Sequence, residues 1–401
     1  MNMYTNEPVR LGIVGAGQRG MAYYTNILKV PEARLTGLCD TDPGRLDAFA
    51  RRWRLDGTLQ TTTLDEMLKG DRVEAVLVTT PDNHHAAVAI RCFQAGKDVL
   101  LEKPLAPTTE ESRAIVRAQR SSGKLLQVGF TLRCTGFYRK VKEIVDAGTL
   151  GQIMFVDACE YLSVAHVASF QTRWHRKKAN AGTFLLSKCS HDLDILNWLI
   201  GSKPTHVASF GGIDYFLPSR APARYCSECP QATSCRYKND PAWHYTQGEV
   251  QNGRRDICVY NDDKDILDNQ VLILQYANKV RATFQLQAFY PRESTRRITI
   301  GGERAYLDGT FNEGKIILRF SDGDRTEVID ASPTEESGHM GGDIVLTREF
   351  ARAVRTRKGT LAGAEAGLAA NVIADAAERA RMQMGVVEID PRDYQLYEGA
   401  T

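Results

Sequence analysis

The chain of 401 residues is too long for one ordinary hydrophobic core and suits two domains. Its 51 basic residues nearly balance 49 acidic ones, which argues against nucleic-acid binding because that function needs a concentrated basic surface. No apolar run approaches the roughly 20 residues of a membrane span. The segment from Met1 to Arg10 lacks the layout of a secretory signal, so we expect a cytoplasmic protein without a membrane partner.

The first 128 residues alternate short apolar runs with amphipathic segments. This alternation is typical of βαβ units around a parallel sheet, and it predicts an α/β, doubly wound Rossmann domain over residues 1–128. The expected strands cover residues 9–14, 34–39, 75–79, 98–102 and 125–130, and the expected helices cover residues 20–29, 43–53 and 112–122.

Residues 129–401 have a different pattern, with longer alternating strands between helices. It predicts an α+β domain with a large open, mostly antiparallel sheet. The expected helices cover residues 137–147, 185–199, 347–355 and 364–384, and the expected strands cover residues 207–211, 269–276, 280–290, 296–301 and 316–320. Asp308-Gly309 and Asp322-Gly323 are predicted turns.

A glycine motif, Gly15-x-Gly17-x-x-Gly20, follows the first expected strand and opens the first expected helix. In dinucleotide-binding proteins the first glycine allows a tight turn, the second lets the pyrophosphate approach the backbone, and the third packs the helix on the strand. The helix start, with Gln18 and Arg19, would offer N–H groups to the phosphates. The motif therefore predicts a dinucleotide site.

Asp40 stands at the end of the second expected strand. A carboxylate there accepts hydrogen bonds from the adenosine ribose and repels a 2′-phosphate. Thr41 and Asp42 follow where an NADP-binding protein has an arginine, so the sequence favours NAD.

Two further stretches carry a family resemblance: TTPDNHH at residues 79–85 and AGKDVLLEKPLA at residues 95–106. They resemble the corresponding motifs of the glucose-fructose oxidoreductase, inositol dehydrogenase and rhizopine-catabolism (Gfo/Idh/MocA) family. The resemblance continues through Gly129-Phe130, Arg133, Gly148-x-x-Gly151 and Gly341-Gly342-Asp343, and thus covers essentially the whole chain.

The resemblance implies an enzyme that uses NAD or NADP on secondary hydroxyls of sugars and inositols. It also implies that residues 129–401 bind the substrate and associate through the face of their sheet into a homodimer or homotetramer. Lys103, in the Glu-Lys-Pro motif, would lie beside the nicotinamide and the reacting hydroxyl. The residues implied at the cofactor in these two stretches are Thr80, Pro81, His85, Glu102 and Lys103.

The helix expected over residues 185–199 is apolar nearly all round, which predicts burial. It nevertheless carries Lys188, His191 and Asp192, which share one face with Ile195. Buried charges are costly unless they are paired or used, so this face indicates either a catalytic group or a structural ion pair.

Alcohol oxidation needs a base that accepts the hydroxyl proton, and histidine suits this near neutral pH. The resemblance places the family's histidine and aspartate at His191 and Asp194. The aspartate that family members commonly carry four residues before the histidine is Ser187 here, and the adjacent Lys188 takes over in our hypothesis. Lys103 and Lys188 then polarise the hydroxyl, and His191 accepts its proton.

A basic run at residues 171–178 surrounds a tryptophan and predicts either a site for an anionic sugar or a solvated loop. Related family members also have an Arg-Trp-His-Arg run, so an anionic substrate does not follow from it. The candidate substrate residues are Arg133, Arg173, Trp174, His175, Arg176, His191 and Asp194.

Two other functions stay open at this stage. Some family members are NAD-requiring glycoside hydrolases, such as N-acetylgalactosaminidases and sulfoquinovosidases, which oxidise the sugar transiently. An anionic glycoside would suit the basic run, and Tyr161 could then serve as a further acid or base. The other possibility is a non-catalytic NAD-sensing or scaffold protein, which the presence of Lys103 and His191 disfavours.

Four cysteines fall in a proline-rich insertion at about residues 217–260. Their pattern, Cys226-x-x-Cys229 with Cys235 and Cys258, suits a structural zinc site in a cytosolic chain. His244 is a rival to Cys258 as the fourth ligand. Free thiols and disulfides are the alternatives, and four protein ligands would leave no open position for catalysis.

Overall fold

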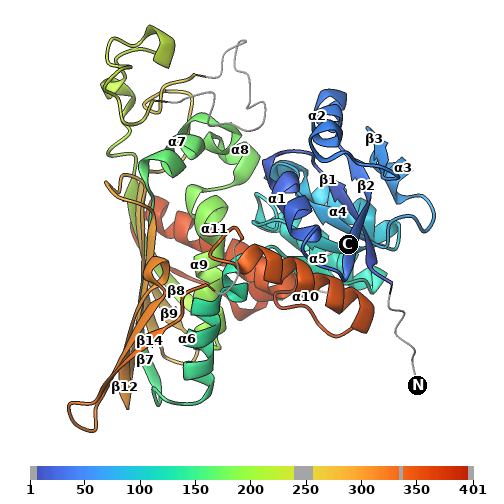
Figure 1. Ribbon diagram of the computed structural model, residues 1–401. Helices are drawn as coiled ribbons and strands as arrows, with labels where there is room; N and C mark the ends of the chain where they lie inside the picture. Colours follow the sequence, from blue (N-terminus) through green and yellow to red (C-terminus); the bar gives the residue numbers. More distant parts are fainter. Residues whose placement is uncertain (1–6, 239–255, 334–336, 396–401) are drawn as a thin grey trace, which may run out of the picture. The chain divides into compact units, whose positions relative to one another are not determined.

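The computed structural model describes residues 7–238, 256–333 and 337–395 (Figure 1). The chain forms two compact units. Unit 1 comprises residues 1–136, 333–371 and 394–401, and unit 2 comprises residues 137–332 and 372–393. None of the described helices is long and apolar enough to cross a membrane.

Unit 1 contains a six-stranded, fully parallel sheet in the order β3-β2-β1-β4-β5-β6. This is the doubly wound order of dinucleotide-binding domains, so the predicted Rossmann fold is confirmed. The strands are β1 (Val9–Val14), β2 (Ala33–Cys39), β3 (Leu59–Thr61), β4 (Ala75–Val78), β5 (Asp98–Leu101) and β6 (Leu126–Val128). The helices are α1 (Gln18–Ile27), α2 (Pro43–Trp53), α3 (Leu64–Leu68), α4 (His85–Gln94), α5 (Thr109–Ser122) and α10 (Gly342–Thr356), with short 3-10 helices at Asp82–His84 and Thr131–Cys134.

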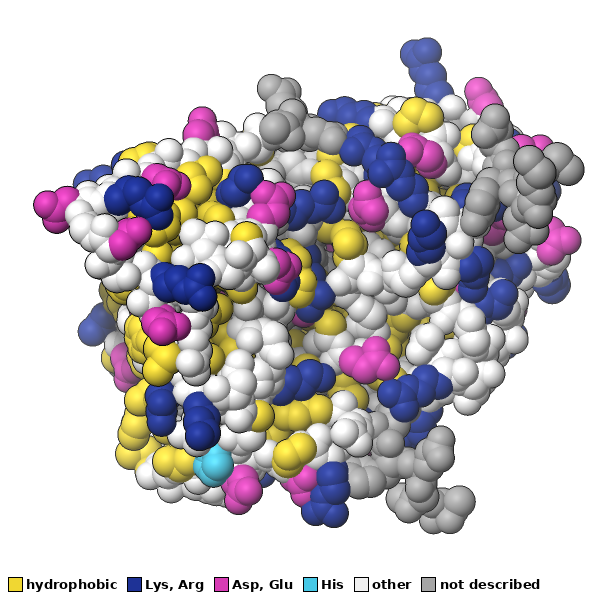
Figure 2. All heavy atoms as spheres, turned by 90° about the horizontal axis from the view of Figure 1, so that it is seen from below, with side chains coloured by type: hydrophobic (Ala, Val, Ile, Leu, Met, Phe, Trp, Pro, Cys, Tyr) yellow, Lys and Arg dark blue, Asp and Glu magenta, His cyan; other side chains and the backbone are white. Residues whose placement is uncertain are grey.

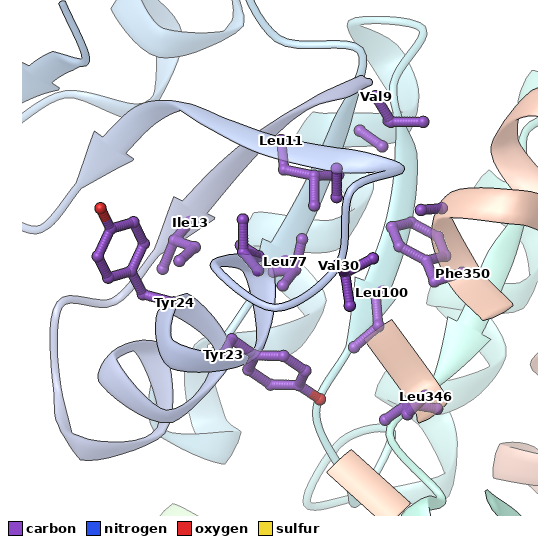
Figure 3. Close-up of a cluster of buried hydrophobic side chains, with 14 of the residues drawn as sticks. Val9, Leu11, Ile13, Tyr23, Tyr24, Val30, Leu77, Leu100, Leu346 and Phe350 are labelled. Atoms are coloured by element: carbon purple, nitrogen blue, oxygen red, sulfur yellow. The ribbon is translucent and has the colours of Figure 1, made fainter. Parts of the chain in front are cut away.

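The core of unit 1 lies between its sheet, helix α1 and helix α10 (Figure 3). Tyr23 comes from α1, and Leu346 and Phe350 come from α10, far along the chain. All three pack with residues of the central strands, such as Leu77 and Leu100. The sequence predicted one boundary, after residue 128, and the division observed differs because α10 buries its apolar face in the first unit.

Unit 2 contains a nine-stranded sheet in the order β14-β13-β12-β11-β7-β10-β9-β8-β15, in which only β7 and β10 pair in parallel. The strands are β7 (Ile153–Tyr161), β8 (Pro204–Gly212), β9 (Asn269–Tyr276), β10 (Arg281–Gln287), β11 (Thr295–Gly302), β12 (Ala305–Thr310), β13 (Lys315–Phe320), β14 (Thr326–Asp330) and β15 (Val386–Glu388). The helices are α6 (Gly136–Asp146), α7 (Val164–Thr172), α8 (Lys178–Ala181), α9 (Phe184–Ile200) and α11 (Ala364–Gln383), the last of which spans the division between the units. Short 3-10 helices lie at Trp174–Arg176, Pro218–Arg220, Cys226–Glu228, Phe311–Glu313 and Pro391–Tyr394.

This sheet confirms the expected large, mostly antiparallel sheet of the second domain, although several elements were not predicted, among them β12, β14 and β15. Strand β7, in the middle of the sheet, had no counterpart among the predicted strands. The turn predicted at Asp308-Gly309 is wrong because both residues lie inside β12, where Gly309 pairs with Ile298 of β11. Gly309 leaves room for the Phe137 ring, since a Cβ atom there would lie 2.7 Å from it.

The two faces of the unit 2 sheet have different surroundings. Helices α6 and α9 lie against one face (Figure 1). The strands alternate buried and exposed residues, as in β9, where Leu272 and Leu274 are buried and Val271 and Ile273 are exposed. We call the face that carries Val271 and Ile273 the open sheet face.

Candidate active site

The glycine loop joins β1 to α1, and two of its glycines are required by geometry. Gly15 has φ +101°, and a Cβ atom there would lie 2.8 Å from the Thr79 carbonyl oxygen. A Cβ atom on Gly20 would lie 2.2 Å from the Gly15 carbonyl oxygen. Gly17, the N-cap of α1, has open space around its Cα and no side-chain cap, so an anion can approach the helix start there.

Asp40 lies at the end of β2 and holds this loop. Its carboxylate accepts hydrogen bonds from the backbone N–H groups of Ala16, at 2.8 Å, and Asp42, at 2.9 Å. Each bond uses a different carboxylate oxygen, and a carboxylate oxygen has two lone pairs. Asp40 can therefore support the loop and still accept a bond from a ribose hydroxyl. Gln18, the first residue of α1, is exposed.

Arg19, the second residue of α1, is half-buried and contacts three buried polar side chains of unit 1. We call the set the Arg19 cluster: Arg19, Tyr23, Glu102 and Asp343. The guanidinium donates two parallel bonds of 2.9 Å to Asp343 of α10 and one of 2.6 Å to Glu102. The Tyr23 hydroxyl donates to the same Glu102 oxygen at 2.6 Å. Arg19 and Glu102, both predicted to bind the cofactor, thus bind each other and join the loop to β5 and α10.

The charges of the Arg19 cluster stabilise one another. Burial alone would raise the pKa of Asp343, but Arg19 and His339 hold it well below its usual value. Burial would likewise raise the pKa of Glu102, and Arg19 and Tyr23 hold it below its usual value. The two carboxylates raise the pKa of Arg19 although burial opposes this. The cluster is therefore a set of fixed charges.

Lys103 follows Glu102 directly, at the end of β5, and is half-buried. Its charge lowers the pKa of the buried Asp82 carboxyl, although burial is stronger and raises that pKa well above its usual value. The peptide bond between Lys103 and Pro104 is cis. Thr80 and Pro81, in the segment after β4, are half-buried.

His85 is fully buried at the start of α4. Its Nδ1 lies 2.9 Å from the Pro104 carbonyl oxygen, and its Nε2 lies 3.1 Å from the Thr80 carbonyl oxygen. Burial lowers the pKa of His85, which favours the neutral ring with a single N–H. Both facing groups are acceptors, so the neutral ring donates to one carbonyl oxygen at a time, and His85 lies between the two segments that carry the family motif.

Helix α9 carries the predicted base and is buried except at Asn197 and Trp198. The Thr183 side chain caps its start, and Gly201, in the left-handed region at φ 67°, ends it. Ser187, His191 and Asp194 are all buried on this helix. The prediction of a helix buried nearly all round is thus confirmed.

Lys188 of α9 belongs to a second buried set of charges, which we call the Lys188 cluster: Lys188, Glu160, Arg296 and Asp192. The Lys188 ammonium lies 3.2 Å from one Glu160 oxygen, and Arg296 Nε lies 2.6 Å from the other. Arg296 Nε also lies 2.8 Å from Asp192, one helical turn after Lys188. Burial raises the pKa of Asp192 to about 6, opposed by Arg296 and aided by Glu160.

Tyr161 lies on the opposite face of β7 from Glu160, because successive strand residues point to opposite faces. Its hydroxyl donates to Gln285 of β10 at 2.9 Å, and its ring packs near Tyr290. The structure thus does not bring Tyr161 together with the Lys188 cluster.

The basic run at residues 171–178 has acidic partners for three of its charges within unit 2. Arg176 is buried and bonds to Asp263 at 2.7 Å, and Lys177 pairs with the same carboxylate. Lys178 bonds to Glu378 at 2.7 Å. Trp174 stacks on His175 with ring centroids 3.6 Å apart, and both are half-buried, as is Arg173. In unit 1, Arg133 donates to the Leu361 carbonyl oxygen at 2.7 Å.

The four cysteines of the insertion line one cavity of about 110 Å³ in unit 2, beside Tyr237 and Tyr260. A bridge between Tyr225 and Ile257 brings the segments of Cys226 and Cys258 together. All nine cysteines are free thiols. Within the described ranges, no three His, Cys, Asp or Glu side chains are gathered closely enough to hold a metal ion. His244, the rival ligand, lies outside the described residues.

Sequence reasoning missed Glu160, Arg296 and Asp82. Arg296 and Glu160 are direct cross-strand partners on β11 and β7, far apart in the chain. In the sequence, each is only a charged residue at an inward-facing position of a strand. That they are partners can be recognised only from the register of β7 against β11. Asp82 lies inside the TTPDNHH stretch. The family resemblance of that stretch was the only signal for it in the sequence.

Two oxidoreductase family descriptions match most of the chain. The first, "NAD-binding Rossmann fold", matches residues 9–130, and the second, "C-terminal alpha/beta domain", matches residues 142–389. A Bacillus subtilis (strain 168) protein, YteT, named only as an oxidoreductase, is 26% identical over 83% of this chain and 86% of its own. The scyllo-inositol 2-dehydrogenase (NAD(+)) of the same organism is 30% identical over 51% of this chain and 58% of its own length.

Solved structures share the fold across nearly the whole chain. Levoglucosan dehydrogenase in complex with NADH has a TM-score of 0.77 at 18% identity, over 96% of this chain and 99% of that one. An oxidoreductase domain protein from Kribbella flavida has a TM-score of 0.76 at 20% identity, over 96% of this chain and all of that one.

Proposed function

Because the chain belongs to the Gfo/Idh/MocA oxidoreductase family, whose NAD-binding Rossmann fold and C-terminal α/β domain it contains, we propose that it is an NAD-dependent sugar or polyol dehydrogenase. It would remove hydride from a carbon that bears a secondary hydroxyl and leave a carbonyl group. The observation that carries the proposal is the buried pair Lys188 and His191 on α9, in a chain with a complete dinucleotide loop. Relatives named as inositol dehydrogenases support this substrate class.

The proposed roles follow from the charges. Lys188 has a carboxylate partner 3.2 Å away, and an ammonium group donates hydrogen bonds but accepts none. It is therefore suited to polarising the hydroxyl oxygen together with Lys103, and the proton falls to His191. Asp194, which the family resemblance pairs with His191, would contact the substrate.

The cofactor would be held by the glycine loop, the start of α1 and Asp40. The uncapped N–H groups at Gly17 suit a pyrophosphate, and the Asp40 carboxylate suits an unphosphorylated ribose. When bound, NAD supplies the hydride acceptor. Arg19 and Glu102 would act by holding the loop, and His85 by holding the segments of Thr80 and Lys103.

An NAD-requiring glycoside hydrolase is the second candidate, and the structure offers its anionic form little support. Arg176, Lys177 and Lys178 already have acidic partners, and Tyr161 lies on the other face of β7. One assay separates the candidates: free sugars, inositols and aryl glycosides are given to the protein with NAD, and NADH absorbance and aglycone release are followed together. Net NADH formation is expected; aglycone release without NADH would identify the hydrolase instead.

Structural zinc in the cysteine cavity is a further part of the proposal. Four thiolates are a zinc-binding set, and in the reducing cytoplasm predicted from the sequence they would not form disulfides. Binding would have to draw the thiols closer together than they lie now. Metal analysis of protein purified without chelators should find about one zinc per chain, and the Cys226→Ser variant should lack it. Parent protein without zinc would mean that the four cysteines are ordinary free thiols.

Self-association through the open sheet face completes the proposal. Phe210, Val271 and Ile273 are exposed on adjacent strands, with Phe210 at 56% and Ile273 at 55%. Hydrophobic side chains reach the surface among charged ones (Figure 2), and large exposed apolar patches mark interaction sites. Ile273→Lys should convert a homodimer or homotetramer to monomers in sedimentation velocity, with NAD affinity unchanged. An unaltered sedimentation coefficient would reject this face.

A further inference from the structure

The Lys188 cluster places two positive and two negative charges inside unit 2. Lys188 is 7% exposed and Glu160 is 1% exposed, and the other two members are also buried. Removing charges from water is costly, and well-packed apolar residues in their place are often as stable or more stable. A contribution to stability alone therefore does not explain why these four charges are buried together.

Glu160 occupies the central position because its two oxygens have different partners. One oxygen faces Lys188 at 3.2 Å, and the other faces Arg296 at 2.6 Å. Arg296 is its direct cross-strand neighbour, and strands β7 and β11 lie inside the nine-stranded sheet, so the carboxylate rests on a rigid support. Both Glu160 contacts are ion pairs without a hydrogen bond, since the Arg296 Nε–H donates to Asp192. It is the paired strands that place the buried Glu160 carboxylate beside the otherwise flexible Lys188 side chain.

The two carboxylates of the cluster do different things. Asp192 bonds to Arg296 at 2.8 Å and balances its charge. Glu160 contacts both cations and joins Arg296 to Lys188. The Lys188 Nζ also lies 3.3 Å from His166 Nε2 of α7, so it is held from a second side. Of these groups, Lys188 is the one with a proposed role in the reaction.

We propose that Glu160, held by Arg296, is a positioning residue that fixes the Lys188 ammonium where it donates to the substrate oxygen. This inference rests on the proposed function and adds to it a residue outside every family motif quoted above. A lysine has four rotatable side-chain bonds and costs much entropy to order. A displacement of about 1 Å at a reacting group can lower the rate about 100-fold. Loss of the carboxylate that positions Lys188 should therefore lower kcat strongly.

A double-mutant cycle tests the inference on the intact protein with the substrate found in the panel assay. Glu160→Gln should lower kcat by about 100-fold with NAD affinity unchanged. In a Lys188→Met background the same change should alter kcat by less than about threefold, because the residue through which it acts is gone. Asp192→Asn, which removes a carboxylate from the same cluster, is the matched control and should affect kcat much less.

A second readout does not depend on turnover. Acetic anhydride attacks amines that reach solvent, and a lysine without its buried carboxylate partner can extend its amine toward water. Mass spectrometry should find Lys188 acetylated at least about tenfold faster in Glu160→Gln than in the parent protein, with Lys178, paired with Glu378, unchanged as the internal reference. If Glu160→Gln does not fold, Glu160→Asp, which withdraws the carboxylate by one methylene, gives the same readouts with smaller effects.

The outcomes are distinct. Equal effects of Glu160→Gln in both backgrounds, equal effects of Asp192→Asn, or unchanged acetylation of Lys188 would each overturn the inference. No NADH from the parent protein with any substrate would instead overturn the proposed function, and the acetylation rates would still decide whether Glu160 holds Lys188.

Discussion

Each unit contains a cluster of charged side chains that is buried apart from the half-buried Arg19, and the clusters differ in which residue lies at their centre. In the Arg19 cluster a guanidinium is bonded through all its nitrogens to Asp343, Glu102 and Tyr23. In the Lys188 cluster a carboxylate is central, and a single amine stands at the edge. An arginine fork that has several partners fixes structure, whereas a flexible amine with one carboxylate partner can still donate to a substrate. The Arg19 cluster therefore joins segments of unit 1, whereas the role in the reaction that we propose belongs to Lys188 of the second cluster.

The largest effect should come from helix α9, which carries the proposed proton acceptor. His191→Ala removes the proposed proton acceptor, and general base catalysis contributes about 100- to 10,000-fold, so kcat should fall to that extent. NAD affinity, measured by fluorescence titration, should stay unchanged because the dinucleotide loop is in unit 1. Ser190→Ala changes the neighbouring buried residue on α9 and is the control. Turnover retained in His191→Ala would show that His191 is not the proton acceptor.

The Arg19 cluster should respond in the opposite manner. Asp343→Asn leaves Arg19 with half of its anionic partners, so the free energy of unfolding should fall by about 3 kcal/mol and NAD affinity should fall because the loop loosens. Glu349→Gln on the same helix removes an exposed ion pair with Arg352 and should cost less than about 1 kcal/mol. Urea denaturation measures both, and equal effects would mean that the Arg19 cluster does not hold the loop.

The two clusters should also differ in pH dependence. The pKa of Asp192 is raised to about 6 in the folded protein, so its ionisation destabilises the fold increasingly as the pH rises from about 4 to above 6. The stability cost of Asp192→Asn should therefore be smaller at pH 7.5 than at pH 5, by roughly 1 kcal/mol.

The pKa of Asp343 is held well below its usual value, so its contribution is complete at both pH values and is lost only in stronger acid. In a His339→Asn background, which removes the imidazole paired with Asp343, the cost of Asp343→Asn should be the same at pH 5 and pH 7.5. Denaturation curves of the variants and their parents at the two pH values check this, and a pH dependence equal to that of Asp192→Asn would contradict the distinction.

The smallest functional effect should come from the basic run. Arg176 is committed to Asp263 and to backbone carbonyl oxygens, so Arg176→Met should lower stability by about 1–3 kcal/mol but leave substrate choice alone. The ratio of KM values for a neutral sugar and its 6-phosphate should change by less than about twofold. A selective rise in KM for the phosphorylated sugar would show that Arg176 does bind the anionic group of a substrate.

Much of unit 1 was predictable because its signals are local. Helix α2, over Pro43–Trp53, begins and ends where the sequence predicted, since Asp42 caps its start and Pro43 suits a first helical turn. The glycine spacing placed the loop correctly because Gly15 and Gly20 meet backbone atoms that exclude a Cβ atom. What could not be read locally was the role of Arg19, because Asp343, its partner, lies in a helix near the other end of the chain.

The candidate site in unit 2 was predictable only in part. A lysine and a histidine on an apolar helix stood out at Lys188 and His191, because charge in such a pattern is unusual. Glu160 did not, because it lies in a strand whose apolar alternation it interrupts. Only the register of β7 against β11 brings it to Arg296.

The most direct test of hydride removal from a secondary hydroxyl uses sugars and inositols deuterated at every carbon, incubated with the protein and NAD. We expect mass spectrometry to find one deuterium on the reduced cofactor, with a primary isotope effect on single-turnover rates. Reduced cofactor that never carries deuterium, whichever substrate is offered, would contradict the account.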